Sequence, residues 1–341
     1  MASAVLAGCG AIPNGGRGEV PAAGPVVAAV SYAGPEVYLI DPVAFDLCAR
    51  VPLRSMGVDP TPLPGQRAFA LALCGGVGVQ TDDAVAFVTA SGTPELEYVQ
   101  LEHPNPGSIE VLQDGSLIVG HGWHDDGGWV FSLVDPLARR LVREGRVREA
   151  AGPAAVVSGW VWTTGEPRPD GRVELWRTSA DLVISQPVGA PVRGGFLVLA
   201  DPAGVSTVLA VSSQHGEATV ERRDATTGEV RASVTVTGVV DAVSGGVTCG
   251  DALVLVDASG ADMTHPGGPL IVLDAMTFDE LRRIDVGGSI SSIAAWGDRV
   301  LVTRWDTGEL VEVYPTSGEV GRRMVLPDAD GVMLQIAVLD D

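Results

Sequence analysis

Two histidines and two aspartates lie close together in the segment HGWHDDGG, residues 121–128. Imidazole nitrogens and carboxylate oxygens bind divalent metals, and a histidine beside a carboxylate can also act as a general base. The glycines in this segment allow many backbone conformations, so the spacing specifies no ligand geometry. We therefore expect no resident cofactor and no bound metal. His121, His124 and Asp125 are instead candidate ligand-binding residues.

The composition excludes several mechanisms and partners. All 22 basic residues are arginine, a bias that GC-rich codon usage also explains. Without lysine, the chain can form no Schiff base and no Ser–Lys dyad. It also contains no Gly-x-Ser-x-Gly, His-Glu-x-x-His or Gly-x-Gly-x-x-Gly motif. A formal charge of −21 disfavours nucleic acid as a partner, although solubility accounts for the charge as well.

The segment LAGC, residues 6–9, resembles the lipobox of bacterial lipoproteins. The resemblance implies that Cys9 carries a diacylglyceryl group after cleavage before it, which places the protein on the extracytoplasmic side of the cell membrane with membrane lipid as a partner. Only eight residues precede Cys9 and none is basic, so residues 1–8 are interpreted as a truncated signal-peptide remnant. Residues 9–24 are rich in Gly and Pro, which is typical of a flexible, here lipid-anchored, tether. A chance match in a disordered N-terminus is the alternative.

Three further cysteines are present. Each lies among apolar residues, which predicts buried and inert thiols. Their odd number allows at most one disulfide among them. They are Cys48, Cys74 and Cys249.

A phrase of two alternating apolar segments joined by a polar turn recurs along the chain. Each copy has the two-residue period of a half-buried strand, and each turn carries the Asp, Pro, Thr or Gly that tight turns need. The turns are about 41 to 50 residues apart, which is the length of one four-stranded propeller blade. The seven copies begin at Glu36, Ala84, Gly128, Gly171, Ala218, Pro269 and Glu309.

The repeat predicts an all-β fold, a single seven-bladed β-propeller over residues 25–341 built from four-stranded antiparallel blades. We name the strands of each blade A to D from the axis outward, so the repeated phrase is strands C and D. The first copy has no room for an inner strand, because the tether precedes it. The C-terminal segment Gly331–Leu339 is a spare strand that can supply it and close the ring, which leaves no long free sheet edge.

The copy containing DATTG, residues 224–228, resembles the unit of YVTN-type repeat propellers, of the quinoprotein amine dehydrogenase-like superfamily. The YVTN tetrapeptide itself is absent. Quinone-cofactor dehydrogenase propellers have a tryptophan after each such unit, and none follows Gly228 here. Trp-Asp repeat propellers need that dipeptide in most blades, whereas Trp305-Asp306 stands alone. The resemblance implies an architecture and not an activity, because propellers host many functions.

In a propeller, the B–C loops and the links between blades lie on one face, usually the ligand-binding face. All five histidines map to this face, although loops hold polar residues in any case. Convergence of His121, His124 and Asp306 at the mouth of the channel would favour an enzyme or a small ligand, and dispersal would favour a protein partner. The candidate ligand-binding residues are His103, His121, His124, Asp125, His215, His265, Arg304, Trp305 and Asp306.

Three functions are consistent with these observations. The first is an extracytoplasmic, membrane-anchored lipoprotein that binds a small ligand or a protein through this face. The second is a lactonase-like hydrolase, in which a metal or a His–Asp pair activates water. The third is a purely structural ring. The missing catalytic signature favours the binding module over the enzyme.

Overall fold

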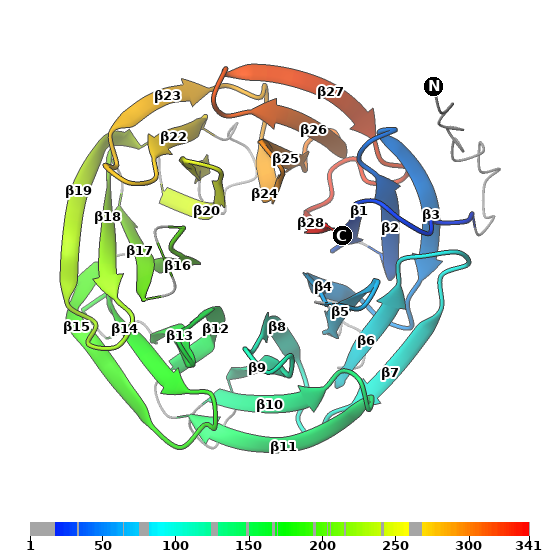
Figure 1. Ribbon diagram of the computed structural model, residues 1–341, viewed down its shortest axis with the longest axis horizontal. Coiled ribbons are helices and arrows are strands. Elements are labelled where there is room, and N and C mark those ends of the chain that lie inside the picture. Colours follow the sequence, from blue (N-terminus) through cyan, green and yellow to red (C-terminus); the bar gives the residue numbers. More distant parts are fainter. Residues whose placement is uncertain are drawn as a thin grey trace, which may run out of the picture.

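The computed structural model is a ring of seven four-stranded antiparallel sheets around a central axis (Figure 1). It describes residues 18–32, 34–63, 65–74, 82–123, 129–147, 150–165, 168, 170–193, 196–202, 204, 206–214, 216–239, 242–258 and 268–340. The described part of the chain contains no helix that is long and apolar enough to span a membrane. The expected all-β, seven-bladed propeller is confirmed.

The blades follow one another in chain order, and each runs from an innermost strand A to an outermost strand D. Blade 1 consists of β28 (Leu334–Leu339), β1 (Val26–Ser31), β2 (Glu36–Asp41) and β3 (Asp46–Pro52), and blade 2 consists of β4 (Gly57–Pro62), β5 (Ala68–Leu73), β6 (Ala84–Thr89) and β7 (Leu96–Gln100). Blade 3 consists of β8 (Pro106–Val111), β9 (Leu117–Trp123), β10 (Trp129–Asp135) and β11 (Arg140–Val147), and blade 4 consists of β12 (Ala150–Val157), β13 (Trp160–Gly165), β14 (Arg172–Ser179) and β15 (Ser185–Arg193). Blade 5 consists of β16 (Phe196–Ala200), β17 (Thr207–Gln214), β18 (Gly216–Asp224) and β19 (Val230–Val239). Blade 6 consists of β20 (Ala242–Cys249), β21 (Ala252–Ala258), β22 (Leu270–Asp274) and β23 (Glu280–Ile284). Blade 7 consists of β24 (Ile290–Trp296), β25 (Arg299–Arg304), β26 (Glu309–Tyr314) and β27 (Glu319–Val325).

The last strand of the chain closes the ring. β28 pairs antiparallel with β1, in a register that runs from Val26 opposite Leu339 to Ser31 opposite Leu334. It therefore supplies strand A of blade 1, as the spare C-terminal segment predicts. Each repeated phrase forms strands C and D of its blade, which is also as expected.

Alternating strand directions give the ring two faces. The B–C loops and the links between blades form one face, which we call the loop face. The A–B and C–D turns form the other, which we call the turn face. The two chain ends of the ring, Val26 of β1 and Leu339 of β28, both lie at the turn face.

The C–D turns repeat one hydrogen-bonding scheme. In blade 1, the Asp41 carboxylate accepts the N–H groups of Val43 and Ala44 at 2.8 and 3.0 Å. Such an aspartate satisfies turn donors that would otherwise need water, which explains its recurrence in the sequence. The same scheme is built on Asp135, Asp224 and Asp274.

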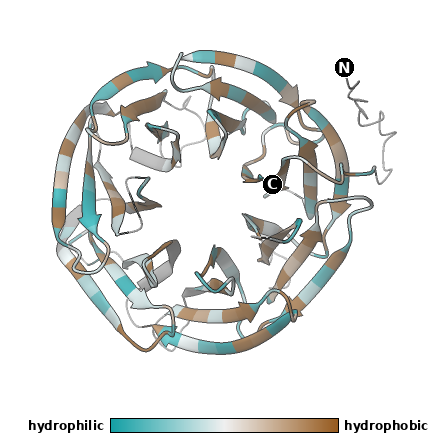
Figure 2. Ribbon diagram, viewed as in Figure 1, coloured by the Kyte–Doolittle hydropathy of each residue, from teal (hydrophilic) through white to brown (hydrophobic). Residues whose placement is uncertain are grey.

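The core lies between neighbouring blades, where both faces of the middle strands are covered. Every residue of β1 and β5 is buried, whereas the outermost β27 is mostly exposed. Figure 2 shows the corresponding change from apolar middle strands to outermost strands of mixed hydropathy. The middle strands β1, β5 and β6 accordingly consist almost entirely of Val, Ala, Leu and Phe, since neither of their faces meets water.

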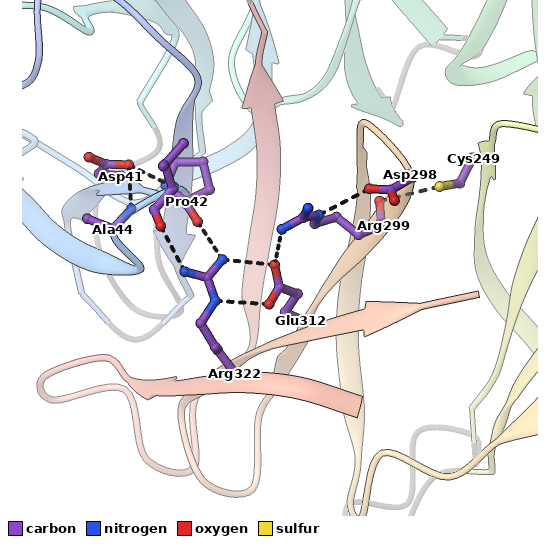
Figure 3. Close-up of polar contacts among 9 residues, drawn as sticks. Asp41, Pro42, Ala44, Cys249, Asp298, Arg299, Glu312 and Arg322 are labelled. Atoms are coloured by element: carbon purple, nitrogen blue, oxygen red, sulfur yellow. Dashed lines mark hydrogen bonds and ion pairs between the residues drawn. The ribbon is translucent and has the colours of Figure 1, made fainter. Parts of the chain in front are cut away.

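At several junctions, an arginine side chain of one blade donates hydrogen bonds to the following blade. Arg322 of blade 7 donates to the carbonyl oxygens of Pro42 and Val43 in blade 1, at 3.0 and 2.8 Å (Figure 3). The same guanidinium lies 4.7 Å from the ring centroid of Phe45 and donates two bonds to Glu312. A planar fork with five donors can make all these contacts at once, which a lysine ammonium cannot.

Comparable contacts occur at three other junctions. In each, an arginine donates to a backbone carbonyl in the C–D turn of the following blade, so these bonds join blades and not strands. They are Arg143 to Asp181, Arg177 to Ala225, and Arg222 to Ala275 and Met276.

Candidate functional site

A buried polar network lies at the loop face of blade 3. His121 is at the end of β9, Ser132 is on β10 and Glu144 is on β11. Ser132 and Glu144 are opposite each other in the antiparallel register, so both side chains point to the same side of the sheet. His103 belongs to the link between β7 and β8, beside the same sheet. His121 and Ser132 are almost fully buried, at 1% and 0% exposure.

The Glu144 carboxylate is the centre of this network. It accepts the Ser132 hydroxyl at 2.6 Å, the Glu102 backbone N–H at 3.0 Å, and a short contact from Nδ1 of His103. Burial raises the pKa of Glu144, but these hydrogen bonds outweigh burial and hold its pKa below the usual value. Glu144 is therefore an anion at neutral pH, and it fixes the orientation of the His103 ring.

His121 is held from both sides. Its Nδ1 lies 3.1 Å from the carbonyl oxygen of Pro104 and its Nε2 lies 2.7 Å from the Ser132 oxygen. Ser132 donates its hydroxyl proton to the Glu144 carboxylate. The network thus holds the His121 ring between the Pro104 carbonyl and the Ser132 hydroxyl, with the Glu144 carboxylate on the far side of Ser132.

Only part of the expected residue set comes together. The rings of His103 and His121 are 6.1 Å apart, centroid to centroid, and meet edge to face. The expected His124, Asp125, His215 and His265 lie outside the described residues, as does Cys9. Sequence reasoning missed Ser132 and Glu144. A serine within the otherwise apolar segment WVFSLV of β10, with a glutamate opposite it on β11, is the signal that could have found them.

The Arg304, Trp305 and Asp306 group lies in blade 7, well away from blade 3 around the ring (Figure 1). The Arg304 guanidinium is nearly buried and bonds to Asp306 at 2.8 Å and Glu309 at 2.7 Å. The backbone N–H of Trp305 donates to the Ser289 carbonyl in the preceding link. Within the described residues, these contacts hold the loop of blade 7 and do not reach His103 or His121.

Two carboxyl groups on adjacent innermost strands form a second polar feature. Asp59 of β4 accepts the N–H of Ile109 of β8 at 2.5 Å, and the Asp59 N–H donates to Gln335 of β28. Burial raises the pKa of Asp59 to about 6. Burial, with the neighbouring Asp59, raises the pKa of Glu110 to about 8. Asp59 thus joins three blades near the axis, while Glu110 is largely neutral at pH 7.

The described residues contain no group of three or more histidine, cysteine or acidic side chains that could hold a metal ion. Cys74 and Cys249 have free thiols, and burial raises the pKa of both. Cys48 is buried but disulfide-bonded. The expectation of an inert thiol is therefore wrong for Cys48, because a local apolar context says nothing about a partner elsewhere in the chain.

No protein-family model matches this chain, and no curated protein matches it. Solved structures match it at low sequence identity, so they show the fold alone. A protein of unknown function from Desulfotomaculum acetoxidans is 10% identical with a TM-score of 0.67, over 92% of this chain and 99% of that one. Hydrazine synthase from Kuenenia stuttgartiensis is 12% identical with a TM-score of 0.59, over 87% and 90%. AztD from Citrobacter koseri is 12% identical with a TM-score of 0.52, over 93% and 98%. The topology and these likenesses define the chain as a seven-bladed β-propeller.

Proposed function

We propose that this chain is an extracytoplasmic, lipid-anchored propeller that binds a ligand or a protein partner through its loop face. The observation that carries the proposal is the buried network of His121, Ser132 and Glu144, which holds the more exposed His103 in one orientation. Polar groups are costly to bury, and a fully hydrogen-bonded set fixes geometry in return. A fixed, partly exposed imidazole is a suitable anchor for an incoming polar group.

The separation of the described candidate residues between blades 3 and 7 supports a broad surface over a catalytic pocket. Within the described residues, no contact joins the His121 region of blade 3 to Asp306 of blade 7. Polar groups spread around a rim suit the large, shallow area of a protein partner better than the enclosed volume of a small ligand.

Binding is tested by thermal shift with defined probes at 1 mM: Zn²⁺, Mn²⁺, Ca²⁺, citrate, glucose, spermidine and a γ-lactone. A small ligand of the loop face stabilises the native chain and loses that effect in a His103→Gln variant. A Val43→Ser variant on the turn face is the matched control and keeps the effect. Stabilisation that survives His103→Gln would place binding elsewhere, and no stabilisation by any probe would restrict the proposal to a protein partner.

The anchor is tested separately on Cys9. The full chain, expressed behind a complete lipoprotein signal peptide, is expected to gain the mass of a diacylglyceryl group and to sediment with membranes. A Cys9→Ser variant loses both. Intact mass before and after reduction also detects a disulfide at Cys9, and that result would contradict the anchor.

The His103–Glu144 pair favours a hydrolase as the second candidate function. A carboxylate that orients an imidazole through Nδ1 is the arrangement of a general base. Turnover of γ-lactones and aryl esters, with and without EDTA, tests this function. A rate that falls in both His103→Gln and Glu144→Gln supports it, and a rate equal to buffer in the native chain rejects it.

A further inference from the structure

The junction between blades 7 and 1 shows how one arginine can be fully partnered. The Arg322 guanidinium donates to two turn carbonyls of blade 1, lies 4.7 Å from the ring centroid of Phe45 and bonds to the Glu312 carboxylate at 2.9 and 3.0 Å. A single guanidinium thus carries an aromatic ring over its face and a carboxylate at its edge, and the two contacts do not exclude each other.

Arg143, on strand D of blade 3, has only one of these three kinds of partner. It donates to the backbone carbonyl of Asp181 in the C–D turn of blade 4. The residue opposite it on β10 is Leu133, whose side chain offers no acceptor. The turn residue of blade 4 with a positive φ is Leu182, whereas blade 1 has a phenylalanine with a positive φ. Among the residues that the structure describes, no carboxylate lies within ion-pair distance of Arg143 and no aromatic ring lies over it.

A pocket of about 440 Å³ lies beside Arg143, between blades 3 and 4 on the turn face. Its deepest apolar side chains are Leu112 and Leu133, which are 7% and 8% exposed. The other apolar residues that line it are Val142, Val156 and Ala180. The volume falls within the range of small-molecule sites, and a hydrocarbon ring placed against these side chains would remove apolar surface from water.

Two carboxylates at the same pocket each have one oxygen without a hydrogen-bond partner. Asp114 accepts the Ser116 N–H at 2.9 Å through Oδ1. Asp181 accepts the Ser179 hydroxyl and the Val183 N–H, both also through Oδ1. In the described part of the chain, no group donates to Oδ2 of either aspartate. The pocket therefore offers oxygen acceptors for a cationic group as well as guanidinium donors for an anionic one.

We propose that this pocket binds a free aromatic α-amino acid of the size of phenylalanine. The ring packs against the apolar wall beside Arg143, the α-carboxylate bonds to the guanidinium, and the α-ammonium bonds to the aspartates. The ligand then supplies the ring and the carboxylate that Arg322 has at the other junction. A zwitterion suits this chain better than a simple anion, since a net charge of −21 repels anions. The site is independent of the proposed loop-face binding and of the lipid anchor.

Isothermal titration calorimetry of the native chain tests the ligand class. The probes are L-phenylalanine and three relatives that each lack one group: 3-phenylpropionate lacks the ammonium, phenethylamine lacks the carboxylate, and L-alanine lacks the ring. L-Phenylalanine is expected to bind most tightly. Loss of the carboxylate or of the ring is expected to weaken binding at least about tenfold, and loss of the ammonium, which meets exposed carboxylates, at least about threefold.

The same titrations can overturn the proposal. No binding of L-phenylalanine at about 10 mM would reject the site, because that limit excludes even a weak small-ligand affinity. Phenethylamine or L-alanine binding as tightly as L-phenylalanine would refute the role of the carboxylate or of the ring. Equal binding of 3-phenylpropionate would overturn the amino acid and leave an aromatic carboxylate as the ligand.

Substitutions test the location of the site. Arg143→Gln removes the partner of the carboxylate and is expected to weaken L-phenylalanine binding at least about tenfold. Arg140→Gln is the matched control, because Arg140 is an exposed arginine of the same strand that does not line the pocket. Its affinity is expected to change less than about twofold.

A second variant keeps the test decisive if Arg143→Gln does not fold. Ala180→Leu places additional methyl groups in the pocket and retains the Arg143 side chain with its bond to blade 4. It is expected to weaken L-phenylalanine binding at least about tenfold by occupying the space of the ring. Unchanged affinity in either folded variant would overturn this location.

Discussion

Glu312 offers a direct test of the arginine contacts that join blade 7 to blade 1. Its side chain is 2% exposed and accepts bonds from Arg299 at 2.6 Å and from Arg322 at 2.9 and 3.0 Å (Figure 3). Arg322 in turn holds the carbonyl oxygens of blade 1. A Glu312→Gln substitution keeps the shape of the side chain and removes its charge.

The size of the effect follows from the pKa. Arg322 above all, and then Arg299 against the opposing effect of burial, lower the pKa of Glu312 from 4.5 to about 2. A carboxyl with a depressed pKa stabilises the fold above its unfolded pKa and loses that contribution as the pH falls through its folded pKa. At about 1.4 kcal/mol per pH unit, this lowering of the pKa by about 2.5 corresponds to a contribution of at most about 3.5 kcal/mol. It is fully present above pH 4.5 and is lost between about pH 4.5 and 2.

The assay is reversible urea unfolding followed by tryptophan fluorescence between pH 2.5 and 7. At pH 7, Glu312→Gln is expected to lower the free energy of unfolding by about 2 to 3 kcal/mol, because two arginines are left without their anion. At pH 2.5, the variant and the native chain should differ by less than about 1 kcal/mol. Glu319→Gln, an exposed position on the neighbouring strand, is the matched control. A deficit of equal size at both pH values would refute the reasoning.

Three further changes test other parts of the fold by the same unfolding measurement. Arg222→Lys loses the planar fork that reaches the next blade and is expected to cost about 1 to 3 kcal/mol; an unchanged midpoint would show that the contact is dispensable. Gly228→Ala places a Cβ 2.0 Å from Val188 at a φ of +78° and is expected to cost about 2 to 4 kcal/mol, whereas Gly115→Ala, at +83° with open space around it, costs about 1 kcal/mol. Equal costs would show that the close approach relaxes freely. Glu110→Gln is expected to stabilise the fold by up to about 3 kcal/mol at pH 7 and by less than about 1 kcal/mol at pH 5. The reason is that a carboxyl group with a raised pKa destabilises the folded state increasingly as the pH rises above 4.5. A difference in stability between the variant and the native chain that does not change with pH would contradict this.

The architecture was predictable because short sequence patterns define each hairpin. Two-residue alternation and aspartate turns define each C–D hairpin within about 18 residues, and the repeat distance gives the blade length. The closing strand was also predictable, since one apolar segment was left over at the C-terminus and one blade lacked a strand. The arginine contacts between blades were not predictable, because they join residues that are distant in sequence, such as Arg322 and Pro42. The absence of lysine was attributed to codon usage, and the structure adds a physical role for the arginines.

The candidate site was only partly predictable. Assigning loops to faces placed His103 and His121 together, because both flank strands of the same blade. Sequence reasoning missed Ser132 and Glu144, because the alternating pattern identifies only a buried position on one strand and an outward position on the next. The strand register, which the sequence does not give, places the two side chains opposite each other so that they can form a hydrogen bond. Arg304 resembled a binding residue in sequence, but its charge is used within blade 7 by Asp306 and Glu309.

Ring closure by β28 also sets the time at which the protein can be finished during its synthesis. Val26 is among the first residues of the ring to leave the ribosome, and its partner Leu339 is among the last. Until those final residues emerge, the nascent chain carries an unpaired inner edge on β1, which is open to pairing with other strands. A chain that is interrupted before β28 would therefore leave an open ring, so blade 1 cannot be completed until every other blade has been synthesised.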